Sequence, residues 1–159
     1  MINNPESLFK QISQGVYVIG VSDGIRQNAF TAAWVIQVSF KPPLLAISIN
    51  PQSTSYQILK AGGICSINVL GQHQAKLAEH FGQSAVDKMA GHQWQSAETG
   101  APILSESHAY FDCKVSHYTE AGDHIIAIFK VVTAAQLNEG QPLLYKSTGD
   151  LDGSSQLYK

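Results

Sequence analysis

The chain contains few of the residues that recognise nucleic acids or mark a membrane segment. Arg26 is its single arginine, and the formal net charge is −2. Such a chain has no basic surface for nucleic acid or for an anionic membrane. No apolar run approaches the ~20 residues that span a bilayer, and Pro5 and Glu6 stand where a signal peptide carries positive charge. We therefore expect neither a nucleic acid nor a membrane among its partners.

The chain is also poor in cysteine. Its two cysteines, Cys65 and Cys113, lie far apart in the sequence, and each stands inside an apolar, strand-like segment. They could pair, but the favoured interpretation is two buried thiols in a reducing compartment. This interpretation predicts a cytoplasmic protein.

Several catalytic and metal-binding motifs are missing as well. The sequence contains no C-x-x-C, no H-E-x-x-H and no clustered Cys/His spacing, so we expect no metal site and no thiol redox pair. It also contains no G-x-S-x-G and no G-x-G-x-x-G. The first absence argues against a hydrolase elbow, and the second against a dinucleotide-binding Rossmann turn.

What is present is typical of one folded domain, which we expect to occupy residues 1–159, because 44% of the residues are hydrophobic and 14% are charged. The pattern predicts helices at residues 5–12 (capped by Asn4), 54–60 and 72–81, with a further helical turn at 84–90. It predicts strands at residues 16–21, 30–40, 44–49, 64–70, 109–118 and 125–135. Residues 91–102 are expected to form a surface loop, and the Gly/Ser/Asp-rich tail to be loosely held. Without an alternating βαβ pattern, these elements favour a mainly antiparallel β-barrel with a few short helices.

A cluster of hydroxyl residues stands where a strand ends and a helix begins. Ser53, Thr54 and Ser55 follow the strand at 44–49, with Asn50 just before them. Free N–H groups and the positive end of the helix dipole suit a phosphate there. The alternative is ordinary N-capping, for which serine and threonine are preferred residues. Three hydroxyls in a row favour a ligand without excluding the cap.

A second candidate segment consists of small residues beside a large aromatic ring. Thr31, Ala32, Ala33 and Trp34 offer a narrow backbone edge to which a flat ring can approach closely, although this segment taken alone is more typical of an ordinary core strand. His124 follows Gly122 and Asp123 in the connection between two long strands. It can donate a hydrogen bond to a ligand, or it is simply a solvated turn residue.

Taken in order, these segments resemble the flavin reductase-like family of FMN-binding split barrels, and most closely the flavin reductase modules of flavodiiron proteins and flavoredoxin-like domains. The resemblance covers most of the chain. It is carried by Asn28 with Thr31-Ala32-Ala33, by Pro42-Pro43-Leu44, by Asn50 with Ser53 and Ser55, and by Gly122-Asp123-His124.

The resemblance implies a Greek-key split β-barrel and an oxidoreductase that transfers electrons from NADH or NADPH to FMN, with FAD as the alternative flavin. It implies that Ser53 and Ser55, with Thr54 between them, hold the flavin phosphate, and that Asn28 and Asn50 orient the flavin. Thr31, Ala32, Ala33 and Trp34 would line the ring through backbone groups, and His124 would act near the nicotinamide. Lys88 is the candidate basic partner of the phosphate, although Met89 follows it where many relatives carry phenylalanine.

The family also implies a homodimer with the flavin near the subunit interface, and a redox partner protein is a further expectation. Typical reductases of this family carry a small residue where this chain has Trp34. The larger indole can narrow access for the nicotinamide. This departure motivates an alternative function, a non-catalytic FMN electron carrier that a partner protein reduces. A third alternative is a structural barrel that binds no flavin.

Overall fold

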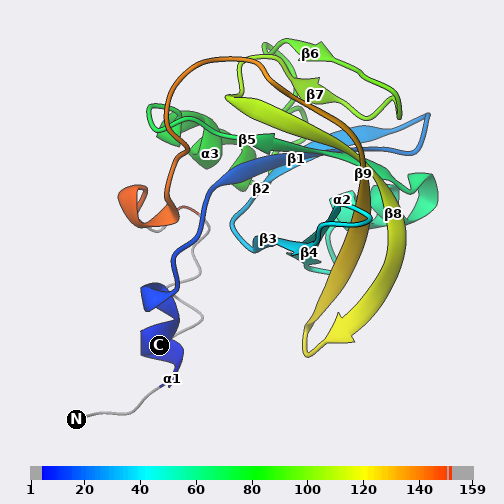
Figure 1. Cartoon of the computed structure of the whole chain (residues 1–159). Helices are drawn as coiled ribbons and strands as arrows, with labels where there is room; N and C mark the ends of the chain where they lie inside the picture. The colour runs from blue at the N-terminus through cyan, green and yellow to red at the C-terminus, as the bar shows by residue number, and fades with distance from the viewer. Residues whose placement is uncertain (1–4, 150, 152–159) are drawn as a thin grey trace.

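The structure is a computed structural model that describes residues 5–149 and residue 151. Its main element is a seven-stranded sheet in which every neighbouring pair is antiparallel (Figure 1). The strands of this sheet are β1 (Tyr17–Ser22), β2 (Gln27–Ala32), β3 (Val35–Ser39), β4 (Leu44–Ile49), β5 (Ile64–Val69), β8 (Ala109–Ala121) and β9 (His124–Gln136). The protein is therefore mainly β with few helices, as the sequence predicts.

The two edge strands of the sheet are consecutive in the chain. The strand order is β2-β1-β5-β8-β9-β4-β3, yet only Ala33 and Trp34 separate β2 from β3. The sheet must therefore curve until its edges approach each other at these two residues. The Trp34 carbonyl accepts a hydrogen bond of 3.1 Å from the backbone N–H of Ser48 in β4.

The single strand predicted over residues 30–40 is wrong for this reason. β2 ends at Ala32 and β3 begins at Val35, because the chain crosses there from one edge of the sheet to the other. Small and apolar residues continue through the crossing, so hydrophobicity does not mark it.

Short helices cover parts of the sheet. They are α1 (Pro5–Leu8), α2 (Thr54–Gly62) and α3 (Ala75–Gly82), with two 3-10 helices, η1 (Phe9–Gln11) and η2 (Tyr145–Ser147). Helix α2 packs on β1 and β2, and α3 packs mainly on β2. The approach of α2 is close, because a Cβ atom at Gly62 would lie 1.9 Å from the Ser22 carbonyl oxygen. Gly63 then ends α2 in the left-handed region, at φ 70°.

Three predicted segments differ from the structure. The helix expected at 5–12 divides into α1 and η1. The helical turn expected at 84–90 is wrong, because Gln83 is extended after α3 and a series of turns follows. The loop expected at 91–102 contains β6 (Trp94–Gln95), which pairs with β7 (Ile103–Leu104).

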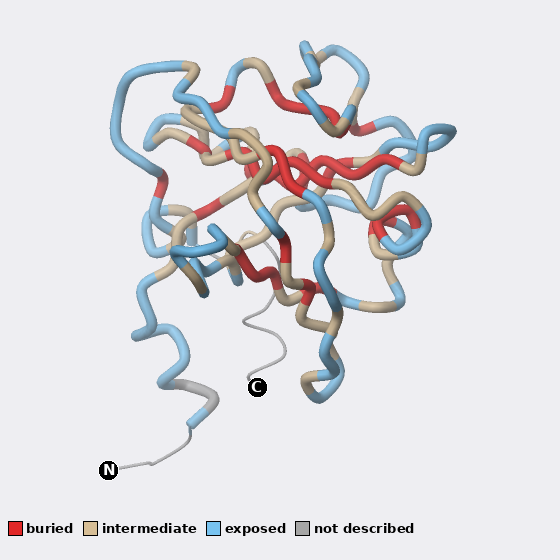
Figure 2. The backbone as a smooth tube through the Cα atoms, turned by 45° about the vertical axis from the view of Figure 1, so that its right-hand side comes forward, coloured by how far each residue is buried: buried red, intermediate tan, exposed pale blue. Residues whose placement is uncertain are grey.

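The core lies on both faces of the central strands (Figure 2). Successive side chains of a strand point to opposite faces, so Val18 and Ile19 of β1 belong to two different clusters. Ile19 packs with Phe129 under α2, whereas Val18 packs with Phe81 under α3. A strand buried on both faces fixes the position of its neighbour β2, which carries the candidate site.

The two cysteines stand directly opposite each other on β5 and β8. Both thiols are free and fully buried, as the sequence predicts, and burial raises the pKa of the Cys65 thiol. The expected cap at Asn4 and the tail beyond Leu151 lie outside the described residues. Within the part of the chain that the structure describes, no helix is both long enough and apolar enough to cross a bilayer.

Candidate functional site

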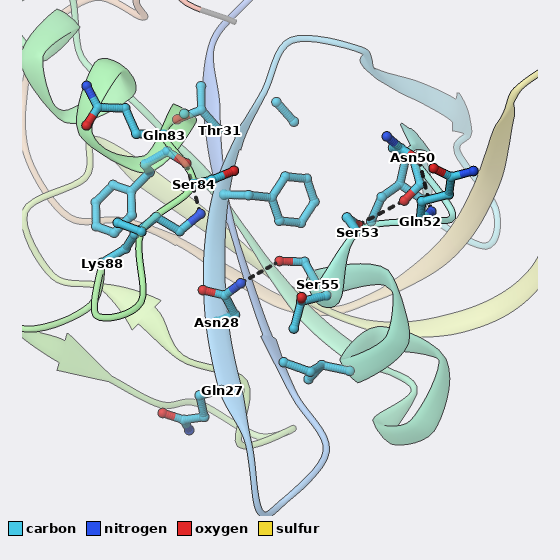
Figure 3. Close-up of a pocket in the computed structure, with 18 of the residues that line it drawn as sticks. Gln27, Asn28, Thr31, Asn50, Gln52, Ser53, Ser55, Gln83, Ser84 and Lys88 are labelled. Carbon is cyan, nitrogen blue, oxygen red and sulfur yellow. Dashed lines mark hydrogen bonds between the residues drawn. The ribbon is translucent and has the colours of Figure 1, made fainter.

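A cavity of about 1120 Å³ lies beside the edge strand β2 (Figure 3). Its walls are β2 with the two residues that follow it, the end of β4, the first turn of α2, and the segment after α3. All of the site residues singled out in the sequence line this cavity: Asn28, Thr31, Ala32, Ala33, Trp34, Asn50, Ser53, Thr54, Ser55, Lys88 and His124. The structure therefore brings segments that are distant in the sequence around one space.

The first turn of α2 presents hydrogen-bond donors to the cavity. Ser53 is the N-cap, because its Oγ accepts a hydrogen bond of 3.1 Å from the Tyr56 N–H and donates one of 2.9 Å to the Asn50 carbonyl. The capping alternative thus describes Ser53. The backbone N–H groups of Thr54 and Ser55 have no acceptor among the described residues. Thr54 and Ser55 therefore offer two unused N–H groups and two hydroxyls at this wall of the cavity.

Asn28 connects β2 to this turn. Its side-chain amide donates a hydrogen bond of 2.9 Å to Ser55 Oγ, and Ser55 is buried. Because Ser55 Oγ accepts this bond, its own hydroxyl hydrogen remains available to a ligand. The pair holds the strand and the helix terminus at a fixed separation.

The other end of β2 forms a narrow ledge. Thr31 Oγ1 donates a hydrogen bond of 2.6 Å to the Ala78 carbonyl of α3, so its hydroxyl points away from a ligand. Ala32 and Ala33 add little bulk. Since β1 is the only strand paired with β2 among the described residues, β2 presents outward N–H and C=O groups that the sheet does not use.

An aromatic pair closes this end of the cavity. The rings of Trp34 and His124 lie 5.0 Å apart between centroids and are tilted by 56°. His124 begins β9, and its Nδ1 lies 2.7 Å from Asp123 Oδ1. This hydrogen bond lowers the pKa of the Asp123 carboxyl. It also fixes the orientation of the imidazole ring.

Lys88 supplies a cation from the opposite wall. The residue is only 8% exposed, its Nζ donates to the Phe81 carbonyl at 3.3 Å, and burial lowers its pKa. Two contacts anchor its segment, because His80 Nε2 donates to the Lys88 carbonyl at 2.7 Å and Trp94 Nε1 donates to the Met89 carbonyl at 3.0 Å.

Several lining residues are not among those predicted from the sequence. They are chiefly Arg26 just before β2, Gln27 at its start, Gln52 before α2, and Gln83, Ser84 and Val86 after α3. No motif marks the segment after α3, and its nearness to Lys88 in the sequence is the only available signal. Arg26 stands out in the sequence only as the single arginine.

The charge of the lining has one sign. Among the described residues that line the cavity, Arg26 and Lys88 are cationic and none is acidic. Within the same described part of the chain, no group of three His, Cys, Asp or Glu side chains is placed to hold a metal ion. The cavity thus favours an organic anion.

A family model described as the flavin reductase like domain matches residues 9–152. The chain belongs to the flavin reductase-like family. This agrees with the resemblance carried by the sequence motifs. The flavin reductase-like chain is 31% identical over 135 residues to HsaB, the reductase subunit of a flavin-dependent monooxygenase of Rhodococcus jostii, a match that covers 85% of this chain and 69% of HsaB.

Two further proteins extend the comparison. RutF of Agrobacterium fabrum, named an FMN reductase (NADH), is 31% identical over 136 residues, which covers 84% of this chain and 78% of RutF. The structure of SgcE6, named an NADH:FAD oxidoreductase of Streptomyces globisporus, superposes with a TM-score of 0.82 at 29% identity, covering 89% of this chain and 86% of that one.

The residues of the cavity fit a flavin nucleotide. Thr54 and Ser55 offer unused N–H groups at a helix N-terminus, which is a common site for phosphate. Ala32 and Ala33 leave room for a planar ring against a strand edge, and the cationic lining suits a phosphate ester.

Proposed function

We propose that this protein is an NAD(P)H-dependent flavin reductase that binds FMN in the cavity beside β2, with FAD as the alternative flavin. The observation that carries this proposal is the cavity itself, which joins a helix N-terminus with free N–H groups to a narrow strand edge and a histidine. A bound flavin supplies the redox chemistry by accepting a hydride from the nicotinamide.

In this proposal, the first turn of α2 binds the phosphate. The N–H groups of Thr54 and Ser55 and the hydroxyls of both residues donate to the phosphate oxygens, and Lys88 Nζ approaches from the opposite wall. Ser53 acts indirectly, because it caps and holds the turn that presents these donors.

The ledge of β2 receives the flavin ring. Backbone groups of Thr31, Ala32, Ala33 and Trp34 contact its edge, and Asn28 orients the part between ring and phosphate. The side-chain oxygen of Asn50 accepts a hydrogen bond of 2.9 Å from the Gln52 N–H. The side-chain NH₂ of Asn50 is then free to donate towards the flavin.

His124 acts at the nicotinamide side. In the neutral ring, the hydrogen bond to Asp123 holds the proton on Nδ1 and leaves the Nε2 lone pair free. His124 therefore positions or polarises the reacting groups, and it does not act as a nucleophile. Proximity supplies most of the catalysis, because well-oriented partners gain up to ~7–11 kcal/mol.

A rapid-mixing experiment tests the proposal. Protein loaded with FMN is mixed anaerobically with NADH and, separately, with NADPH, and the flavin absorbance band is followed. We expect bleaching with at least one donor. If neither donor bleaches the flavin, the remaining function is that of a non-catalytic FMN electron carrier. The indole of Trp34, 40% exposed at the ring end, favours that alternative. A protein that stays colourless with added FMN would leave the structural barrel.

The relatives support a choice of electron donor and flavin. RutF is named for NADH and FMN, and SgcE6 for NADH and FAD, so we propose NADH as the first donor to test. HsaB is named as the reductase subunit of a monooxygenase. We accordingly propose that reduced flavin passes from this protein to a partner enzyme.

The same proposal includes the assembly. A Greek-key split barrel is supported by the curved sheet whose edge strands meet at Ala33 and Trp34. A homodimer is supported by three exposed apolar side chains, Ile36 at 64% and Val38 at 47% in β3 and Phe40 at 83% in the turn just after it; we call these three residues the β3 stripe. Exposed apolar patches commonly mark protein interfaces.

Two broader expectations also enter as proposals. One domain over residues 1–159 is supported by the single continuous main sheet. A cytoplasmic location is supported by the two free thiols, Cys65 and Cys113.

A further inference from the structure

We propose that Arg26 forms a second phosphate subsite in the cavity, which adds affinity for a dinucleotide beyond that for a mononucleotide. The inference rests on the proposed function and adds a ligand class to it. The chemistry recognised is the second phosphate of a dinucleotide. FAD and the nicotinamide nucleotide can both supply such a phosphate, and the experiment below distinguishes them.

The turn between β1 and β2 holds Arg26 in place. Its Nε donates to Asp23 Oδ2 at 3.0 Å, and the same carboxylate accepts the backbone N–H groups of Ile25 at 2.9 Å and Arg26 at 2.6 Å. These bonds lower the pKa of the Asp23 carboxyl, the backbone bonds most of all. Asp23 therefore stays ionised at neutral pH and anchors the guanidinium through Nε alone.

The remaining donors of Arg26 are free to bind a ligand. Its Nη groups have no partner among the described residues, and its side chain is 52% exposed at the rim of the cavity. A guanidinium presents its N–H groups in a planar fork that matches two phosphate oxygens. The Asp23 carboxylate offsets part of the positive charge of Arg26. Binding of a phosphate would therefore depend on the geometry of the guanidinium N–H groups as much as on their charge.

Arg26 immediately precedes β2 and lines the same cavity as the proposed phosphate site. Asn28, the second residue of β2, lines this cavity too. Asn28 in turn bonds Ser55 at the start of α2. Figure 3 shows Gln27 at the opposite end of the site from Asn50 and Ser53, with Asn28 and Ser55 between them.

FMN leaves this end of the cavity unused. It carries one phosphate, for which Thr54, Ser55 and Lys88 already provide donors. In FAD the second phosphate is linked directly to the first, and Arg26 lines the same cavity as Ser55. We therefore assign the subsite to the diphosphate of FAD.

Flavin-binding titrations of the purified protein test this assignment. FMN and FAD affinities are measured for the wild type, for Arg26→Ala and for Lys76→Ala, a control that removes one exposed cation of α3 outside the cavity. We expect Arg26→Ala to weaken FAD binding by about five- to tenfold, as for one partly exposed charge-assisted contact, and to leave FMN binding unchanged. Lys76→Ala should change neither affinity. The affinity of the wild type for FAD relative to FMN should also fall as salt is raised.

The other outcomes separate the sources of the phosphate. If FAD affinity is unchanged but Arg26→Ala raises KM for NADH and NADPH alike, the subsite holds and its ligand is the diphosphate of the nicotinamide nucleotide. Equal losses for FMN and FAD would overturn the inference, and so would no change in any affinity or KM. A wild type that binds no flavin would instead contradict the proposed function itself.

Discussion

The side-chain amide of Asn28 donates a hydrogen bond of 2.9 Å to Ser55 Oγ and so ties the edge strand β2 to the first turn of α2. The two residues are 27 positions apart in the chain. This contact sets the separation between the ledge of β2 and the free N–H groups of α2. Both ends of the proposed flavin site depend on this hydrogen bond. The two serines of the turn, Ser53 and Ser55, have separable roles.

Replacing Ser55 and replacing Ser53 should give different results. Ser55→Ala removes the acceptor for Asn28 and a donor to the phosphate, so we expect FMN binding to weaken by ~1–3 kcal/mol. Ser53→Ala removes the N-cap, and the free energy of unfolding should fall by ~1 kcal/mol with a smaller effect on FMN. Flavin titration and urea unfolding measure the two quantities. A larger loss of FMN affinity in Ser53→Ala would contradict this division.

His124→Ala should slow flavin reduction more than it weakens FMN binding. The imidazole is held by Asp123 and Trp34 at the ring end, far from the donors to the phosphate. We expect the rate of reduction by NADH to fall by about 10²-fold, the loss that a small misplacement of reacting groups can cause. Stopped-flow absorbance gives the rate, and a titration gives the affinity. Equal losses in both would mean that His124 supports the flavin rather than the reaction.

Trp34 lines the same end of the cavity, and in the proposed function its indole limits access for the nicotinamide. Trp34→Ala should lower KM for NADH, because the indole occupies space beside His124. It should also lower kcat, because the imidazole loses an aromatic contact worth ~0.5–1.5 kcal/mol. Trp34→Phe keeps a ring next to His124 and is the matched control. If KM for NADH stays the same in Trp34→Ala, the indole does not limit entry.

Much of the site could be predicted from the sequence, because its parts are local motifs. Hydroxyl residues after a strand mark the start of α2, and Asp123 and His124 follow a turn glycine. The join between Asn28 and Ser55 could not be predicted, since it depends on how α2 packs across β1 at Gly62. The two hydrogen bonds of the Ser53 hydroxyl, one donated to Asn50 and one accepted from Tyr56, likewise depend on three-dimensional geometry.

The crossing at Ala33 and Trp34 shows why the strand prediction failed. Periodicity follows hydrophobicity, and small and apolar residues continue from Ala32 to Val35 while the chain passes from one sheet edge to the other. Arg26 was missed for a related reason. Its place at the cavity follows from the turn that Asp23 stabilises, and no residue type in its neighbourhood indicates a phosphate.

Lys88 should lower stability while it supports binding. Burial lowers the pKa of Lys88 in the folded protein. At pH values between this lowered pKa and the pKa of Lys88 in the unfolded chain, the unfolded chain therefore binds more protons than the folded protein. In that alkaline window, Lys88 makes the free energy of unfolding rise with pH. Lys88→Met removes this slope, and its Tm at neutral pH should equal or exceed that of the wild type.

The same substitution should weaken FMN binding by ~1–3 kcal/mol, the range for one charged hydrogen bond. In the wild type, FMN affinity should also fall as pH rises through the pKa of Lys88, because the neutral amine no longer attracts the phosphate. Lys88→Arg keeps its charge at high pH, so its FMN affinity should fall only at a higher pH than in the wild type. Thermal melts and titrations across pH check both effects. A lower Tm together with unchanged FMN affinity in Lys88→Met would make Lys88 a structural residue only.

The β3 stripe should decide the oligomeric state. Phe40 is 83% exposed next to Ile36 and Val38, and a buried aromatic anchor of an interface contributes about 2 kcal/mol or more. Phe40→Glu should therefore raise the dimer dissociation constant by at least about thirtyfold, which light scattering over a dilution series can measure. Ile25→Glu is the matched control, because Ile25 is 94% exposed on the turn between β1 and β2 and lies outside the stripe. A wild type that is monomeric at every concentration, or equal masses for the two variants, would refute the proposed dimer surface.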